Sequence, residues 1–447
     1  MKIFLKYVLL YMLLTTLMLG ALFLVSFIPK DLIRQNTKKT AIIMNNEGEK
    51  IYFNSFGRKL YDDNSTDAIM INLTYTIDEE NKLESIIRNR RNYIPGVTKE
   101  VQADNVGNLP YEKQGFSKIN QFSMTKELLK TVRGIEQTSF EYGRYWHGYI
   151  VVLRILLCLF DISIIRAITQ ITILFLLILL MYYLGKNSGF RFSIALFFAF
   201  IATDCFTGSY MLQGKYVTII ALLVSIFIAK KKINSKNLNV WLFISGALTA
   251  YFDFLTTPLL SLLLPIVIYT AIYKDNNSFK KEIIKMIKCF IAWGIGYFGL
   301  WATKWIISDL LYGTDIIKVS FTQIYYRVFG INNDDKIEIK HIEALGKNII
   351  VAINYLMITM YALSFVWAII KKIYYRKKGM FVSANKLPYY VCIIATLAWY
   401  FIIAEHSHKH YFFTYKTMVI PLISTMFIVF DNNKKEKLIK EKDVKND

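Results

Sequence analysis

Long apolar segments separated by basic loops dominate this sequence and limit what it can fold into. The first segment, from about Ile3 to Phe27, exceeds the roughly 20 residues that a helix needs to cross a bilayer. Further apolar segments lie at about 164–185, 191–207, 216–230, 238–254, 257–273, 287–307, 347–370, 388–404 and 413–430. Hydrophobic residues make up 54% of the chain and the mean hydropathy is +0.35. We therefore predict an all-α polytopic membrane protein with about ten transmembrane helices.

The distribution of charge argues against nucleic acid as a partner. The net charge is +21, but Lys and Arg gather between the apolar segments, as the positive-inside rule requires. The basic loops are those at Lys186, 230–236, 274–288 and 371–386, together with the tail. The short loops predicted to lie outside carry Asp204, Asp253 and Glu405 instead. This alternation predicts that the bilayer is a partner and that both termini are cytoplasmic.

The same pattern divides the chain into four parts. Residues 1–28 form a transmembrane anchor without the small-x-small motif at which a signal peptide is cleaved. Residues 29–146 form a large extracytoplasmic loop or domain, and 147–430 an interfacial helix followed by a multi-helix bundle. Residues 431–447 are a basic cytoplasmic tail. The cytoplasmic loops are short and carry no glycine-rich phosphate-binding motif, so we expect any chemistry on the outer face.

Acidic residues of the large outer loop are the first candidates for chemistry. Asp67 follows Ser65 and Thr66, any of which can cap a short helix whose apolar face, including Met70 and Leu73, would lie on the membrane surface. Asp67 is then either a general base at the mouth of a site or only a helix cap. Glu141 is the second acidic candidate.

A second group of polar residues leads into the bundle. His147, Arg154 and Asp161 are seven residues apart, so they would share one face of a continuous helix. A charge at mid-bilayer costs about 2.5–3.5 kcal/mol on insertion scales, which favours an interfacial helix at about 147–160. Its basic stripe would bind a lipid phosphate, or Arg154 and Asp161 would form an ion pair that only packs.

Further polar residues fall at the predicted outer ends of the spans. Asp253 and Lys304 are two of them, and an intramembrane lysine pairs, lines a cavity or snorkels to the headgroups. The segment that contains His406, His408 and His410 holds three of the five histidines. All three would share a face only on an extended strand, and no Cys ligand is near, so hydrogen bonding to a phosphate is favoured over zinc. None of the four cysteines forms a CxxC pair.

Three segments together resemble the GT-C superfamily of bacterial polytopic glycosyltransferases, and more narrowly the membrane proteins associated with cell-surface polysaccharide synthesis. The segments are Asp67-Ala-Ile-Met-Ile-Asn-Leu, Arg144-Tyr-Trp-His-Gly-Tyr149 and His406-Ser-His-Lys-His-Tyr-Phe-Phe-Thr-Tyr415. The first segment follows the anchor, the second precedes the predicted interfacial helix, and the third comes late in the chain. The resemblance in layout covers essentially the whole chain.

The resemblance implies a GT-C-like fold in the bacterial cytoplasmic membrane and a reaction on its outer face. A sugar would pass from a polyprenyl-phosphate-linked donor to a glycan or glycolipid acceptor, with no cofactor and no metal. Asp67 matches best the acid that acts as base, with Glu141 in reserve, although the side-by-side acidic pair of some members is absent. The residues implied to bind substrate or lipid phosphate are Arg144, Trp146, His147, Arg154, Asp253, Lys304, His406, His408 and His410.

Two other functions fit the same pattern. A transporter or flippase of a lipid-linked saccharide would place its binding groups near the midplane and often shows internal repeats. A polymerase, ligase or acyl-transfer enzyme of the same envelope pathway would use a different nucleophile in a large outer cavity. The sequence places its polar groups at the outer rim and shows no convincing repeat, which favours the glycosyltransferase.

Overall fold

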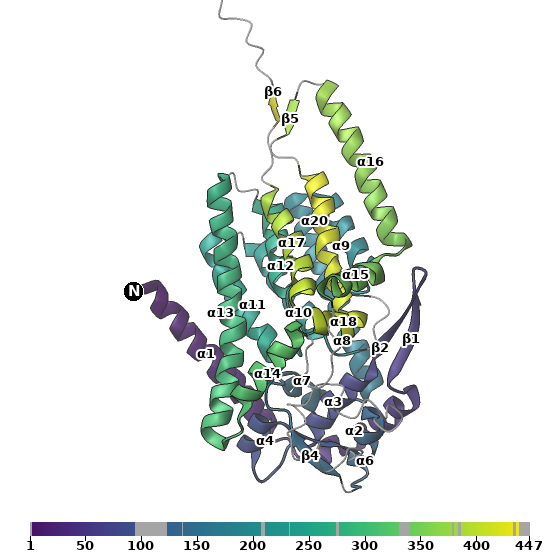
Figure 1. The fold of residues 1–447 in the computed structure, drawn as a ribbon, viewed down its shortest axis with the longest axis vertical. Helices are drawn as coiled ribbons and strands as arrows, with labels where there is room; N and C mark the ends of the chain where they lie inside the picture. Colours follow the sequence, from purple (N-terminus) through teal and green to yellow (C-terminus); the bar gives the residue numbers. More distant parts are fainter. Residues whose placement is uncertain are drawn as a thin grey trace, which may run out of the picture.

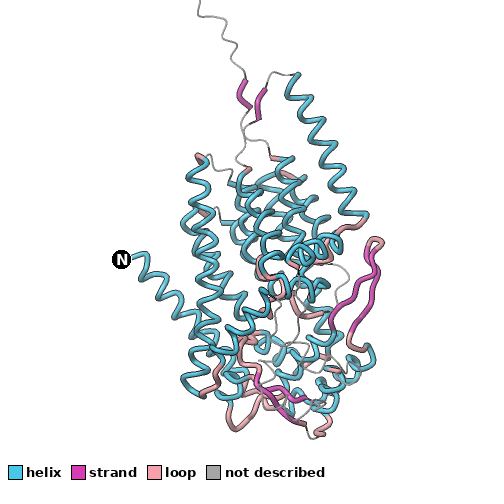
Figure 2. Tube along the Cα trace, viewed as in Figure 1, coloured by secondary structure: helices cyan, strands magenta, loops and turns pink. Residues whose placement is uncertain are grey.

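The chain is largely helical, and its long helices stand side by side above a smaller mixed layer (Figures 1 and 2). The computed structural model describes residues 2–93, 123–135, 137–206, 211–231, 233–273, 277–329, 340–377, 380–382, 386–431 and 435–437. We call the mixed layer the outer domain and the group of long helices the bundle. Most of the tail predicted at 431–447, and residues 94–122 of the large outer loop, lie outside the described residues.

The outer domain is built from short helices and two pairs of β-strands. Strand β1 pairs with β2 and β3 with β4, each pair antiparallel. Its elements are α2 (Lys30–Glu47), β1 (Lys50–Ser55), β2 (Arg58–Asp63), α3 (Asn64–Tyr75), α4 (Lys82–Arg88), β3 (Arg90–Tyr93), α6 (Met124–Val132), β4 (Thr138–Glu141) and α7 (Tyr149–Leu157).

The bundle contains the apolar helices that the sequence predicts. Helix α1 (Lys2–Val25) precedes the outer domain and leans away from the other helices towards its N-terminus (Figure 1). The rest are α8 (Ile162–Ser188), α9 (Phe190–Ala202), α10 (Lys215–Lys231), α11 (Ser235–Phe252), α12 (Leu260–Tyr273), α13 (Phe279–Tyr312), α14 (Ile316–Phe329), α15 (His341–Ala352), α16 (Tyr355–Lys377), α17 (Leu387–Ile402), α18 (Ala404–Lys409), α19 (Tyr411–Thr414), a 3₁₀ turn (Tyr415–Met418) and α20 (Val419–Phe430). Strands β5 (Met380–Val382) and β6 (Lys435–Lys437) pair beside the bundle.

Five helical segments of the described chain are long and apolar enough to span a membrane. They are Leu5–Val25, Ile162–Ser188, Phe279–Tyr312, Tyr355–Tyr374 and Tyr411–Phe430. Helices α9, α12 and α17 are apolar but shorter, and α10 and α11 coincide with the segments predicted at 216–230 and 238–254. The prediction of a helical protein with several candidate membrane spans is thus confirmed.

The segment predicted as one helix at 347–370 is broken, which corrects that boundary. Helix α15 ends at Ala352 and α16 begins at Tyr355. Asn354 causes the break, because its side-chain oxygen accepts the backbone N–H of Met357 at 2.9 Å and its amide donates to the carbonyl of Ala202 at 2.6 Å. A side chain that replaces the backbone partner in this way starts a new helix.

The expectation of a surface helix after Asp67 is also wrong. Helix α3 forms, but Asp63 is its cap and accepts the backbone N–H groups of Ser65 and Thr66. Its apolar side chains Met70 and Leu73 are buried inside the protein. The helix is therefore a core element of the outer domain, because α2, α6 and α7 pack around it.

The predicted interfacial helix is short. Helix α7 covers Tyr149–Leu157, so His147 precedes it and Asp161 caps the following helix α8. These two residues and Arg154 are therefore not on one continuous helix. Arg154 does not form the alternative ion pair with Asp161. Its guanidinium donates instead to the carbonyls of Ile28 and Thr74 at 2.6 Å.

Helices α11 and α13 approach each other most closely through two glycines. A Cβ at Gly246 would lie 2.2 Å from the carbonyl oxygen of Trp293, and one at Gly296 would lie 2.1 Å from that of Phe243. Small residues allow this contact between helix backbones, which dispersion forces then stabilise. A Cβ at Gly294, two positions before Gly296 on α13, would meet only the edge of Phe298 at 3.9 Å.

We predict that Gly296→Ala forces α11 and α13 apart and lowers the free energy of unfolding by about 1–3 kcal/mol, the usual cost of overpacking. Gly294→Ala is the matched control and should be neutral or slightly stabilising, because alanine favours helix. Thermal unfolding of the two purified proteins in the same detergent measures the difference. Equal unfolding temperatures would contradict the proposed role of the glycine contact.

Candidate functional site

A cluster of cationic, imidazole and aromatic side chains lies where the outer domain meets the bundle. We call it the rim cluster, and its members come from three separate parts of the chain. They are Arg144 and Tyr145 before α7, Arg327 from α14, and His406, Lys409 and His410 from α18 and the residue after it. Of the substrate-binding residues expected from the sequence, the structure brings Arg144, His406 and His410 to this place.

Arg327 organises the imidazoles of the cluster. Its Nη1 lies 3.1 Å from Nδ1 of His406 and 3.1 Å from Nε2 of His410. A guanidinium has only donors, so both ring nitrogens accept. Nε2 of His406 lies 2.6 Å from the carbonyl oxygen of Leu255, which can only accept, so this nitrogen carries the proton. The contacts therefore select one neutral tautomer of His406.

The electrostatics of the cluster agree with neutral imidazoles. Burial, and then the charge of Arg327, hold the pKa of His406 well below its ordinary value. Burial does the same for the pKa of His410, with help from His406 and Arg327. The two rings meet with their centroids 4.7 Å apart, because residues four apart share a helix face. At neutral pH the positive charge is thus carried by the Arg and Lys side chains.

Glu405 is the only carboxylate that touches these cations among the described contacts of the cluster. It lies 3.4 Å from Arg327 and 3.1 Å from Lys409 and is fully buried. Lys409 also donates to the hydroxyl of Tyr326 at 2.6 Å. Glu141 lines the cavity beside Arg144, so the three cations Arg144, Arg327 and Lys409 face two carboxylates, which leaves an excess of positive charge.

Arg144 completes the cluster from the other side. Its guanidinium lies over the rings of Tyr142 at 4.6 Å and Tyr145 at 5.3 Å, and its backbone carbonyl accepts from the indole of Trp305 at 2.9 Å. Burial raises the pKa of Tyr145, and the charges of Arg144 and Arg327 both oppose that rise. The charges of both guanidinium groups therefore act on the phenol of Tyr145.

Backbone strain is found beside the same cluster. His147 and Leu255 have φ angles of +56° and +68°, in the left-handed region that a branched side chain such as leucine rarely adopts. His147 is held there by hydrogen bonds of 2.8 Å to the hydroxyl of Tyr149 and to the carbonyl of Tyr142. Burial lowers the pKa of His147 to about 3. Strain of this kind gathers at functional sites, where the surrounding structure imposes it.

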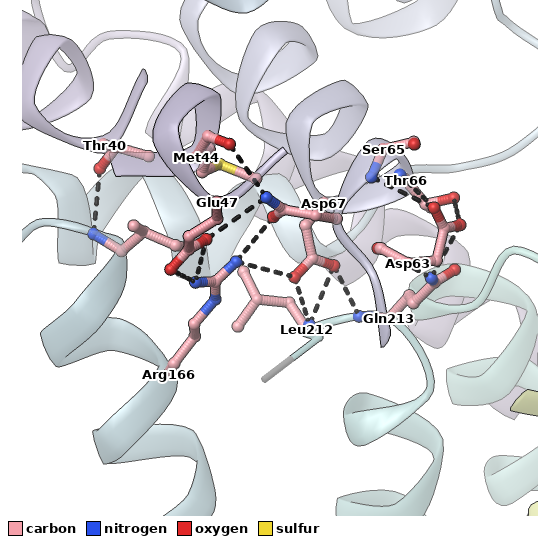
Figure 3. A network of polar contacts seen from close by, with 12 residues as sticks. Thr40, Met44, Glu47, Asp63, Ser65, Thr66, Asp67, Arg166, Leu212 and Gln213 are labelled. Carbon is pink, nitrogen blue, oxygen red and sulfur yellow. Dashed lines mark hydrogen bonds and ion pairs between the residues drawn. The ribbon is translucent and has the colours of Figure 1, made fainter. Parts of the chain in front are cut away.

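Asp67 has a different role from the one expected of an exposed base. Its carboxylate is fully buried and accepts the backbone N–H of Leu212 at 2.9 and 2.7 Å and that of Gln213 at 3.2 Å (Figure 3). Arg166 lies 4.0 Å away and pairs with Glu47 at 2.8 Å. Asp67 thus anchors the segment before α10 to the outer domain.

The environment of Asp67 penalises its charge. Burial is the largest effect and raises the pKa of this carboxyl to about 7, although Arg166 and the two backbone N–H groups act in the opposite direction. A raised pKa is also typical of a general base. Backbone N–H groups, however, occupy both carboxylate oxygens of Asp67. These contacts indicate an anchoring role rather than that of a general base.

Glu141 lies nearer to the rim cluster. It belongs to β4 and forms an ion pair with Arg88, while Arg90 lies 3.8 Å away. A small cavity beside Arg144 is lined by Glu141, Tyr142 and Thr314 among others. The side chain of Glu141 is 20% exposed, whereas that of Asp67 is fully buried, so Glu141 has the better access to a substrate.

Four of the remaining predicted residues hold elements together. Lys304 is buried and donates to the carbonyl of Ile86 at 3.0 Å and to Asn89 at 3.1 Å, so it binds α4 rather than snorkelling. Trp146 donates to the carbonyl of Leu300 at 2.7 Å. Asp253 accepts the hydroxyl and N–H of Thr256, and Arg154 binds carbonyls as described above.

His408 is half-buried, and burial lowers its pKa. It lies two residues from both other histidines, and Ala404–Lys409 is a helix, so His408 does not share their face. Within the described residues, no group of three His, Cys, Asp or Glu side chains is placed to hold a metal ion.

The sequence analysis missed Arg327, Lys409 and the strained Leu255. Arg327 follows two tyrosines in α14, and this cation beside aromatic residues was the available signal. Leu255 gives no sequence signal, because nothing in its type indicates a positive φ.

Comparisons of the chain with protein-family models, with curated proteins and with solved structures gave no match. The case for a function therefore depends on the geometry of the rim cluster and on the chemistry of its residues.

We predict that Asp67→Asn lowers the free energy of unfolding by about 1–3 kcal/mol, because the amide keeps only one of the two acceptor oxygens that receive the N–H groups of Leu212 and Gln213. Asp31→Asn is the control, since the Asp31 side chain is 80% exposed. Thermal unfolding of both variants measures the loss. An Asp67→Asn protein that unfolds like the native one but fails in sugar transfer would instead support the general-base role.

Proposed function

We propose that the protein is a membrane glycosyltransferase of the GT-C kind. It takes a sugar from a polyprenyl-phosphate-linked donor and transfers it to a glycan or glycolipid acceptor on the outer face of the membrane. The observation that carries the proposal is the rim cluster, in which Arg144, Arg327 and Lys409 gather at the junction of the outer domain and the bundle. The proposed arrangement has about ten membrane-crossing segments, including the shorter apolar helices.

The cluster suits the anionic leaving group of such a donor. Guanidinium groups bind phosphate through paired N–H donors, and cations fixed in advance stabilise charge that develops as the sugar leaves. Arg327 is held by its imidazole and carboxylate contacts, so it needs little reorganisation. The aromatic rings of Tyr142, Tyr145 and Phe254 lie within about 6 Å of one another, where sugar rings can stack.

Glu141 is the residue that we propose as general base. It would accept the proton of the acceptor hydroxyl as the oxygen attacks the anomeric carbon, while the bond to the phosphate oxygen breaks and the lipid phosphate departs. The carboxylate lines the cavity beside Arg144, so base and phosphate-binding cation stand next to each other. Asp67 has an indirect role, because it positions the segment that leads into α10.

We predict that Arg327→Gln lowers the rate of sugar transfer by about 10²–10³-fold, the usual effect of removing one donor that stabilises developing charge. Arg34→Gln is the control, because Arg34 is 60% exposed on α2. The assay follows labelled sugar from a polyprenyl-phosphate donor in proteoliposomes at matched protein amounts. Equal rates for the native protein and Arg327→Gln would contradict the role of the cluster.

Glu141→Gln should lower transfer by about 10²–10⁴-fold without a comparable loss of thermal stability, as expected of a general base. Glu84→Gln is a matched control, since Glu84 pairs with the same Arg88 at 2.7 Å but does not line the cavity. Full activity of Glu141→Gln would remove it as the base. Absence of any protein-dependent transfer, combined with protein-dependent movement of the lipid across the bilayer, would replace the enzyme by a transporter.

A further inference from the structure

Helix α1 leaves an apolar groove against α11 and α13 that is separate from the rim cluster. The groove has a volume of about 480 Å³ and is lined by Tyr7 and Tyr11 of α1, Phe243 of α11, and Ile295 and Gly299 of α13, among others. Lys288 and Asn239 are the polar side chains at its edge. Nothing in the proposed transfer reaction uses it.

The groove is a wedge that closes towards the outer domain. Tyr11 is hydrogen-bonded to Thr303, and a Cβ added at Gly299 would lie 3.3 Å from the ring of Tyr11, so the two helices touch there. Towards its N-terminus α1 leans away from the bundle (Figure 1), and Leu5, Leu9 and Leu13 are more than half exposed. The open end therefore lies on the side of Lys288.

The dimensions of the wedge match one leaflet of a bilayer. Lys288 and Gly299 are eleven residues apart on α13, which is about 16 Å along a helix. Half of the roughly 30 Å hydrocarbon core is about 15 Å. Lys288 therefore stands at the depth of the phosphate groups when Gly299 stands near the midplane. The loops on this side are the basic ones, which the charge pattern places in the cytoplasm.

An apolar groove of this size is not filled by water, which needs polar partners and takes only roughly 30 Å³ per molecule. We propose that it binds an anionic phospholipid of the cytoplasmic leaflet, with one acyl chain along the apolar wall and the phosphate beside Lys288. Charge complementarity selects this occupant, since Lys288 is an exposed cation at the mouth of an otherwise apolar wall. The phosphate of a zwitterionic lipid is also anionic, but its choline cation offsets that charge and weakens the attraction to the ammonium.

The bound lipid would fix the angle of α1. Only a small part of α1 is buried by protein, since 17% of its apolar window is buried. A lipid chain in the wedge supplies the missing contacts and holds α1 against α13. Because α1 leads directly into α2, the lipid also steadies the point where the outer domain begins.

Two substitutions on α13 separate the groove from the general membrane surface. Ile295 lines the groove and is 56% exposed, whereas Ile287 does not line it and is 51% exposed. Ile295→Trp fills the wedge and Ile287→Trp adds the same side chain to the outer helix surface. Lys288→Gln removes the charge and keeps a polar side chain that is one bond shorter.

The experiment uses the full-length protein in nanodiscs of equal parts phosphatidylglycerol and phosphatidylcholine, followed by detergent extraction and native mass spectrometry. We expect one phosphatidylglycerol per chain to survive extraction in the native protein and in Ile287→Trp, and to be lost in Ile295→Trp. Lys288→Gln should lower the preference for phosphatidylglycerol by about fivefold, the effect of one cation near the headgroups.

Equal lipid retention in Ile295→Trp and Ile287→Trp would overturn the proposal. Displacement of the retained lipid by added polyprenyl phosphate at equal concentration would overturn it as well, because the groove would then belong to the donor chain. These outcomes do not depend on sugar transfer, so the groove and the enzymatic function can fail separately.

Discussion

Buried cations that bind backbone carbonyls and acids of other segments hold the outer domain on the bundle. Arg58, at the tip of the β1–β2 hairpin, forms a buried 2.5 Å ion pair with Asp204 and donates to the carbonyl of Val351 at 2.8 Å. Arg154 and Lys304 do the same for the ends of α1, α3 and α4. Removing one partner of such a contact leaves an uncompensated buried group, so these contacts fix geometry more than they add stability. The rim cluster depends on them, because Arg144 and Arg327 come from different layers.

At the junction of the outer domain and the bundle, backbone groups of one segment are bound by side chains of another. A carbonyl that loses its partner at a helix end must be satisfied inside the protein where no water enters. Asn354, at the break between α15 and α16, satisfies such a group at the end of α9, the carbonyl of Ala202, and Asp67 accepts backbone donors before α10. The same requirement places the cations Arg58 and Lys304 at this junction. A site for an anionic lipid-linked donor is the use that this surplus of positive charge supports best.

The sequence predicted the general architecture well because hydropathy and charge follow directly from the bilayer. Helices α1, α8 and α13 overlap the predicted segments, and His406 and His410 lie against the same guanidinium, that of Arg327. The break at Asn354 and the burial of α3 depend on tertiary contacts, which a single sequence does not display. Arg327 was missed for a related reason, since its partners lie 78 to 83 positions away. The strain at Leu255 arises only from the packed structure.

The central claim is that the rim cluster binds the phosphate of a lipid-linked donor. Cryo-electron microscopy of the protein in nanodiscs with added polyprenyl phosphate tests this most directly, because the phosphate is the strongest feature of the ligand. The account predicts density for the phosphate between Arg144 and Arg327, within hydrogen-bonding distance of both guanidinium groups. Density for the phosphate at mid-bilayer between the helices, or beside Lys288 alone, would contradict it.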